Sequence, residues 1–261
     1  MKIGISTASF FPREECERAI EIIKQLGADC AEVFLGTFYE YRPEFIKANK
    51  EKFGGIEISS VHSSSINFEP QLFSSARRVR GDGLYWLDQF MRSALALGAK
   101  KYSFHGYISR SVNNVNFDKI ATYLRDICEF CVHYGVDVCL ENVSWCTYNR
   151  PGLFREFKSR CPQLAAVLDI KQARRSGYPV NMYIEDMAGA ISHVHLSDVT
   201  ASGKMCLPGK GIYNFEEIFK RLQGTGFDGH AVIEVYGDDY SDYSEIKQSL
   251  EYLKEIAYKI N

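Results

Sequence analysis

The stretch LGAKKYSFH (residues 97–105) contains the end of one element and the whole of the next. The residues that lead into it, Leu84–Leu97, carry apolar side chains at spacings of three and four, which predicts a helix. Gly98 can adopt the left-handed conformation that closes a helix. Lys101–His105 then predicts a short strand that finishes on a histidine. Helix, glycine and strand in this order are typical of a parallel β/α unit.

The same order recurs about eight times, the number of units in a closed parallel barrel. A glycine also precedes the next strand at Gly27, Gly135 and Gly226. The other predicted strands are Ile3–Ser6, Cys30–Leu35, Ile56–His62, Asp137–Glu141, Ala165–Asp169, Ile191–Leu196 and Ala231–Val235. The other clear helices are Glu14–Leu26, Phe117–Tyr134 and Tyr243–Ile260.

These units predict a single (β/α)8 TIM-barrel domain over residues 1–261, because no Pro- or Ser-rich linker divides the chain. An open doubly wound sheet is the alternative fold. It is disfavoured because no GxGxxG motif follows the first strand.

Composition limits the class of partner. A net charge of −2 provides no overall attraction to nucleic acid or to an anionic membrane. The sequence has no signal-peptide pattern and no apolar run of membrane-spanning length, so we expect a cytoplasmic protein. Its eight cysteines have no repeating spacing, and the single CxxC at Cys128 and Cys131 lies in a helical pattern. We interpret the cysteines as buried thiols rather than a zinc ribbon.

The functional signal lies at the strand ends. In a parallel barrel the active site is at the C-terminal ends of the strands, which are otherwise apolar. Six consecutive strands end on residues of metal-ligand type: His62, His105, Glu141, Asp169, His195 and Glu234. Three carboxylates at one mouth repel one another unless a cation neutralises them. We therefore expect one divalent metal ion, with Mn²⁺ or Mg²⁺ suiting an oxygen-rich set with one imidazole, and Co²⁺ or Zn²⁺ as alternatives.

The ordered motifs VHSSS, FHGY, LENVSW, VLDIKQ, HVHLSD and VIEV resemble those of the xylose-isomerase-like barrels over essentially the whole chain. That superfamily includes sugar isomerases, ketose 3-epimerases, inosose dehydratases and endonuclease IV. The resemblance implies metal ligands at Glu141, Asp169, His195 and Glu234. His193 lies two residues before His195 on the same strand and is the competing candidate, but His195 is followed by the Leu-Ser-Asp of the family pattern.

The chain departs from the endonuclease pattern. Gln172 stands where that group has a histidine, and the segment Gly203–Gly211 lacks the further Asp and His of a three-zinc site. We therefore expect one metal rather than three. The chemistry that fits is proton transfer next to a carbonyl, with the enediolate stabilised by the metal and with Glu141 and Glu234 as acid and base.

Five further residues are candidate substrate contacts. His62 and His105 can bind substrate hydroxyls, or they can brace the barrel mouth. Gln172 replaces a histidine that the epimerases use to hold substrate, and Lys171 can hold a phosphate or carboxylate. Its neighbours Arg174 and Arg175 fit better as solvated helix residues. Lys210, in the turn Leu207–Gly211, marks a second candidate anion site with exposed amides, or an ordinary tight loop.

We therefore expect a metal-dependent isomerase or epimerase of a small sugar, ketose or sugar phosphate. A dehydratase that uses the same enolate, a divergent endonuclease-IV-like phosphodiesterase and a non-catalytic sugar-binding barrel are the alternatives. The expected partner is a small carbohydrate, with no nucleic acid and no membrane, and the chain can form a homo-oligomer.

Overall fold

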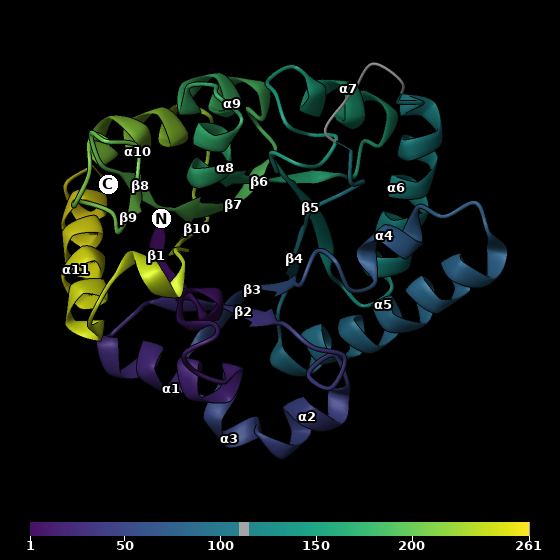
Figure 1. Cartoon of the computed structure of the whole chain (residues 1–261), viewed down its shortest axis with the longest axis horizontal. Helices are drawn as coiled ribbons and strands as arrows, with labels where there is room; N and C mark the ends of the chain where they lie inside the picture. The colour runs from purple at the N-terminus through teal and green to yellow at the C-terminus, as the bar shows by residue number, and fades with distance from the viewer. Residues whose placement is uncertain (110–114, 261) are drawn as a thin grey trace.

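The computed structural model describes residues 1–109 and 115–260. Eight parallel strands form a closed barrel in the order β1-β10-β7-β6-β5-β4-β3-β2. They are β1 (Lys2–Ser6), β2 (Cys30–Leu35), β3 (Glu57–Ser63), β4 (Lys101–Phe104), β5 (Asp137–Glu141), β6 (Ala165–Asp169), β7 (Ile191–Leu196) and β10 (His230–Ile233). Figure 1 looks along the barrel, with the helices arranged as a ring around the strands. The predicted (β/α)8 fold is confirmed.

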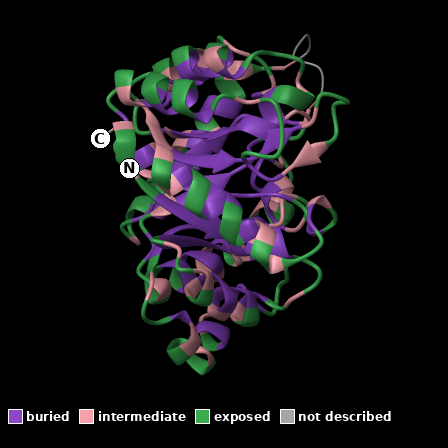
Figure 2. Cartoon of the chain, turned by 90° about the vertical axis from the view of Figure 1, so that its left-hand side faces the viewer, coloured by how far each residue is buried: buried purple, intermediate pink, exposed green. Residues whose placement is uncertain are grey.

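The long helices cover the outside of the barrel and bury one face against it. They are α1 (Cys16–Leu26), α5 (Arg77–Leu97), α6 (Phe117–Val132), α7 (Leu153–Arg160), α10 (Phe215–Gly224) and α11 (Tyr243–Ile260). Shorter helices lie in the loops: α2 (Pro43–Ala48), α3 (Lys50–Phe53), α4 (Glu69–Leu72), α8 (Ile170–Arg175) and α9 (Val180–Asp186). Two 3₁₀ turns, Thr7–Phe10 and Gly237–Asp239, follow β1 and β10. Figure 2 shows that the buried residues are concentrated in the strands and on the inner faces of the helices.

The four glycines predicted to close helices all have left-handed backbone angles. Gly27, Gly98, Gly135 and Gly226 have φ values of 79°, 74°, 68° and 84°. A residue with a Cβ is strained in that conformation, so glycine fixes the point at which each helix turns back to the barrel.

The predicted boundaries differ from the observed ones in a few places. Helix α5 begins at Arg77 rather than at Leu84. Its first turns hold charged residues and two glycines, which hide the apolar period. Gly83 allows close packing on α4, because a Cβ there would lie 2.9 Å from the Cβ of Gln71. The last strand is His230–Ile233 rather than Ala231–Val235, so Glu234 directly follows the strand.

The loop after β7 carries a small hairpin of its own, with β8 (Asp198–Val199) antiparallel to β9 (Met205–Cys206). Within the described part of the chain, no helix has the length and apolar character that a membrane crossing needs.

Candidate metal and substrate site

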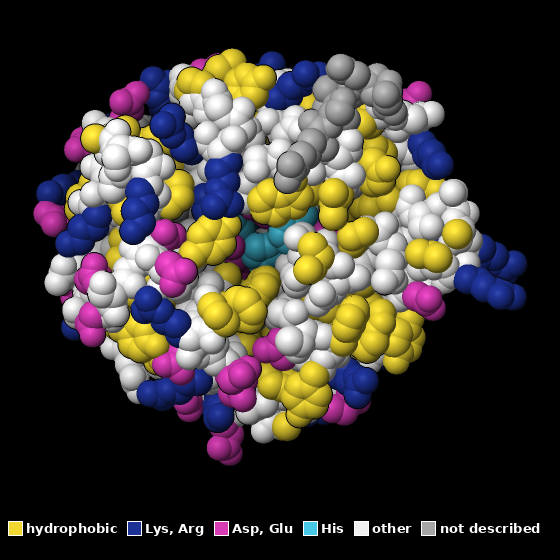
Figure 3. Space-filling model, in the orientation of Figure 1, with side chains coloured by type: hydrophobic (Ala, Val, Ile, Leu, Met, Phe, Trp, Pro, Cys, Tyr) yellow, Lys and Arg dark blue, Asp and Glu magenta, His cyan; other side chains and the backbone are white. Residues whose placement is uncertain are grey.

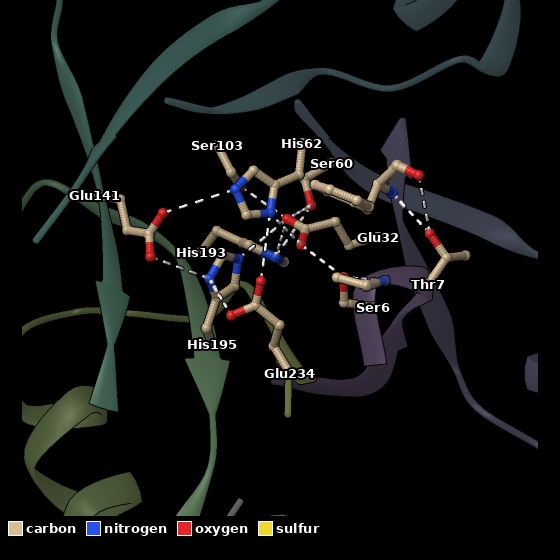
Figure 4. A network of polar contacts seen from close by, with 12 residues as sticks. Ser6, Thr7, Glu32, Ser60, His62, Ser103, Glu141, His193, His195 and Glu234 are labelled. Carbon is tan, nitrogen blue, oxygen red and sulfur yellow. Dashed lines mark hydrogen bonds and ion pairs between the residues drawn. The ribbon is translucent and has the colours of Figure 1, made fainter. Parts of the chain in front are cut away.

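The strand register brings the four predicted ligands together at the C-terminal end of the barrel. Asp169 on β6 is the register partner of His195 on β7. Glu141 ends β5, and the Glu234 amide donates to Leu196 O on β7 at 3.0 Å. Nδ1 of His195 lies 3.7 Å from Glu141 Oε1, 3.6 Å from Asp169 Oδ2 and 3.4 Å from Glu234 Oε2. One imidazole nitrogen therefore faces three carboxylates, all of them buried. Figure 4 shows two of them, Glu141 and Glu234, beside His195.

Unpaired polar atoms test whether this arrangement suits a cation. Nδ1 of His195, Oδ2 of Asp169 and Oε2 of Glu141 are buried and make no hydrogen bond. Leaving such atoms without a partner costs free energy, and a bound ion would satisfy all three. The residues present therefore fit a divalent metal.

The cluster permits more than one grouping of ligands around an ion. Glu141, Asp169 and His195 form one set whose ligand atoms lie within 4.8 Å of one another. Two other sets meet the same limit among the described residues: Glu32, His62, His195 and Glu234, and His62, His105 and Glu141. A buried histidine–carboxylate cluster can thus hold a metal. His195 belongs to two of the three sets.

Asp169 is oriented by its neighbours on both sides. Its Oδ1 accepts from the Gln172 amide at 2.8 Å and so caps α8, while Oδ2 remains directed at His195. The Asn142 side chain bonds both the amide and the carbonyl of Asp169, at 2.7 and 2.9 Å. The backbone of β6 is therefore fixed against β5 at the point where the ligand leaves it.

Sequence reasoning missed Glu32, a fully buried residue at the base of the cluster. Its Oε2 lies 3.1 Å from His195 Nε2 and 3.2 Å from His193 Nε2. Hydroxyl donors complete its surroundings: Ser6, Ser60 and Ser103. The hydrogen bond to Nε2 leaves Nδ1 of His195 facing the other three carboxylates. The signal in the sequence is a single charged residue inside the apolar run CAEVFL.

His193 occupies the layer below. Its Nε2 contacts Ser60 Oγ at 3.0 Å and Glu32, and it is absent from the metal-ligand sets of the described residues. Burial lowers the pKa of His193 to about 4, although Glu32 opposes this shift. This placement favours His195 over His193 as the ligand.

Lys171 reaches the cluster from α8. Its ammonium lies 2.9 Å from Glu234 Oε2 and 3.9 Å from Asp169 Oδ2, and the side chain is buried. Burial works against the charge, but these two carboxylates raise the pKa of Lys171 above its ordinary value. The lysine is therefore a paired cation within the site.

The carboxylates differ in their electrostatic surroundings. Burial would raise the pKa of Glu141, yet the nearby imidazole of His195 lowers it to about 2. Burial raises the pKa of Asp169 to about 6, with Lys171 acting in the opposite direction.

His62 and His105 face each other, with their Nε2 atoms 3.0 Å apart. Each Nε2 is 3.9 Å from Glu141 Oε2. Glu69, a second buried glutamate that sequence reasoning missed, bonds His105 Nδ1 at 3.0 Å and fixes the ring. Burial opposes protonation of His62, but Glu234 and Glu32 raise its pKa to about 10. Both histidines line the mouth. Figure 3 shows histidine side chains, in cyan, within the central opening.

The remaining predicted contacts separate into two groups. Gln172 lines the mouth, where its Oε1 accepts from the hydroxyl of Ser144 at 3.1 Å, which directs its amide nitrogen elsewhere. Lys210 does not line it, and its Nζ contacts Gln248 Oε1 at 3.3 Å.

The candidate anion site at the 207–211 turn required backbone amides that are free to bind an anion. Two of these amides already donate to a carboxylate of the chain. The Asp198 carboxylate accepts from the amides of Gly209 and Gly211 at 3.1 and 3.0 Å. The turn is thus held by an internal acid, which favours the tight-loop interpretation of the segment that contains Lys210.

Comparisons with known proteins agree with this architecture. An uncharacterized protein of Methanocaldococcus jannaschii is 26% identical over 100% of this chain and 92% of its own length. The fructoselysine 3-epimerase of Escherichia coli O157:H7 is 22% identical over 90% of each protein. The crystal structure of D-psicose 3-epimerase with D-tagatose from Clostridium cellulolyticum H10 superposes with a TM-score of 0.79 at 17% identity, covering 98% of this chain and 99% of the other.

Its relatives and structural neighbours thus include sugar epimerases, in agreement with the predicted enzyme class. The family model described as xylose isomerase-like TIM barrel matches residues 20–256, so the chain belongs to that family.

Proposed function

We propose that this protein is a metal-dependent epimerase or isomerase of a small sugar, ketose or sugar phosphate, working by proton transfer through an enediolate. One observation carries the proposal. Glu141 and Glu234 approach the same His195 nitrogen from β5 and from the end of β10, at 3.7 and 3.4 Å. Two carboxylates that flank one cation site are the arrangement that removes a proton on one side of a substrate and returns it on another.

Glu141, Asp169, His195 and Glu234 would hold the metal, which supplies Lewis-acid stabilisation of the enediolate charge. Glu141 and Glu234 act as the acid and base. Asp169 and His195 anchor the ion, with their orientation set by Asn142 and Glu32. We propose Mn²⁺, since three carboxylates and one imidazole form a mainly oxygen set, with Mg²⁺, Co²⁺ and Zn²⁺ as competitors.

His62, His105, Lys171 and Gln172 line the mouth and would bind substrate oxygens. Aromatic side chains complete the wall: Phe11, Phe34, Trp145 and Tyr236. Apolar walls with a few convergent polar groups are the usual composition of a small-molecule site. The expected partner is therefore a small carbohydrate. A cytoplasmic location and a homo-oligomeric state stay predictions.

The test is proton exchange from D₂O into the carbons beside the carbonyl, measured by NMR over a panel of ketoses with Mn²⁺-loaded protein. We expect exchange and epimer formation with at least one ketose. Glu234→Gln should lower the exchange rate by about 10²–10⁴-fold. Glu57→Gln is the matched control, because Glu57 begins β3 at the opposite end of the barrel.

Full exchange in Glu234→Gln with metal still bound would overturn the acid–base assignment. The same spectra separate the dehydratase alternative, whose product has lost one water. Cleavage of abasic DNA by protein that contains three zinc ions would support the endonuclease alternative instead.

A further inference from the structure

The pocket at the mouth changes character with depth. Its inner part is formed by the charged and imidazole groups of the cluster, and its outer part by aromatic residues and serines. Tyr236 belongs to the outer part and is 41% exposed. The two ends of a bound substrate therefore meet different chemistry.

The inner end has no surplus positive charge for an anion. Five buried carboxylates lie there: Glu32, Glu69, Glu141, Asp169 and Glu234. Lys171 and one divalent ion supply three positive charges, fewer than the five that these carboxylates carry when ionised. Lys171 is also held by Glu234 at 2.9 Å, so its ammonium is already paired. A phosphate or carboxylate beside the reacting carbons would be repelled.

An exposed cation, Arg175, lies beside the outer end of the pocket, next to the lining residue Tyr236 but not itself part of the lining. Arg175 lies four residues after Lys171 on α8, so both side chains leave the same face of the helix. Its Nη1 donates to the Tyr236 hydroxyl at 2.9 Å. The guanidinium carbon of Arg175 is 5.2 Å from the centre of the Tyr236 ring, and Lys171 Nζ is 4.4 Å from it. Tyr236 thus connects the inner lysine to an exposed arginine at the rim.

Within the described residues, Arg175 forms no ion pair with a carboxylate, although Asp238 and Asp239 follow Tyr236 in the chain. A guanidinium has five N–H donors, and the hydroxyl of Tyr236 accepts from one nitrogen only. The remaining donors suit two parallel hydrogen bonds to a phosphate or a carboxylate. Figure 3 shows basic side chains over α8 beside the central opening.

We infer that Arg175, supported by Tyr236, binds an anionic group at the end of the substrate remote from its reacting carbonyl. The substrate class is then a ketose with a distal phosphate or carboxylate rather than a neutral free sugar. This inference rests on the proposed function.

Adjacent Arg174 provides a matched control. It lines a separate hollow between α8, α9 and α10, together with Tyr178 and Tyr213. Arg174→Gln and Arg175→Gln remove the same charge from the same helix, but only the second removes the group bonded to Tyr236.

The experiment compares kcat/KM for D-fructose, D-fructose 6-phosphate and D-fructuronate, whose carboxylate is at C6, in three proteins, each loaded with Mn²⁺. We expect the native protein to prefer one anionic substrate over fructose by about tenfold or more, the size of one charge-assisted pair. Which of the two it prefers separates phosphate from carboxylate. Arg175→Gln should abolish the preference and Arg174→Gln should retain it. A native preference for fructose, or equal ratios in both variants, would overturn the inference.

Binding measurements distinguish failure of this inference from failure of the proposed function. If no ketose is turned over, calorimetric titration with glucitol, glucitol 6-phosphate and gluconate measures the rim directly. If the native protein binds an anionic polyol more tightly than glucitol and Arg175→Gln does not, the inference holds even though the proposed function fails. Equal binding of all three would overturn it.

Discussion

Asp169, the last residue of β6, and Asp198, which follows the neighbouring strand β7, are both buried aspartates, yet their carboxylate oxygens have opposite surroundings. Asp198 Oδ1 accepts from the amides of Val199 and Tyr213, and Oδ2 from those of Gly209 and Gly211. Asp169 uses only Oδ1 within the chain, and Oδ2 has no hydrogen-bond partner.

The difference separates two uses of a buried carboxylate. An acid whose oxygens are filled by backbone amides fixes a loop. A buried acid whose oxygen has no hydrogen-bond partner, and which lies among other acids, leaves that oxygen available to a cation from outside the chain. The four predictions that follow test this distinction, from the largest expected effect to the smallest.

Asp169→Asn should reduce metal affinity by more than the roughly hundredfold that loss of an outer-shell partner causes, because a direct ligand is lost. The asparagine oxygen can still cap α8, so the fold should be retained. Titration of Mn²⁺ followed by calorimetry measures the affinity, and circular dichroism checks the fold. Unchanged affinity would mean that the unpaired oxygen has no role in binding.

Asp198→Asn should give the opposite pattern. Asparagine offers one acceptor oxygen in place of two, so about two amides lose their partner. We expect the free energy of unfolding to fall by about 3 kcal/mol. Urea denaturation of metal-free protein measures this, and metal affinity should stay within about threefold of the native value. A loss of metal affinity as large as in Asp169→Asn would erase the distinction.

Glu32→Gln should lower metal affinity by about ten- to hundredfold, which is typical for removal of the group that orients a ligand histidine. Glu32 contacts His195 Nε2 rather than the face that points at the other carboxylates. Calorimetric titration with Mn²⁺ gives the affinity, with Glu57→Gln again as the control. If Glu32→Gln bound metal as the native protein does, His195 would be oriented by other contacts.

Gly211→Ala tests the tightness of the Asp198 loop. A Cβ at this position would lie 2.3 Å from Val199 O and 2.4 Å from Asp198 Oδ1. We expect a loss of about 2 kcal/mol in the free energy of unfolding, as for other overpacked sites. Gly224→Ala is the control, because a Cβ there meets nothing within 4 Å, and it should be neutral or slightly stabilising. Equal stability of the two variants would show that the loop is not tightly packed.

The sequence predicted the barrel and the converging strand ends well, and the reason is physical. The spacing of apolar residues and the position of glycines are local signals. Strands such as Asp137–Glu141 and Ala165–Asp169 were therefore predicted with their observed bounds. Ligand-type residues at successive parallel strand ends must meet at one mouth, so Asp169 and His195 could be paired before their register was known.

The residues that sequence reasoning missed act through contacts between segments far apart in the chain, and periodicity does not reveal such contacts. Glu69 comes from the short helix α4, yet it orients His105, 36 residues further on. The turn that contains Lys210 depends in the same way on Asp198, whose carboxylate accepts from backbone amides 11 and 13 residues further along the chain. Such pairings follow from how loops fold over the barrel.

The measurement that tests the central claim most directly is elemental analysis of the purified protein after dialysis with Mn²⁺, alongside His195→Ala and His193→Ala. We predict about one metal ion per chain in the native protein and in His193→Ala, and none in His195→Ala. No bound metal in the native protein, or equal binding in both histidine variants, would contradict the account.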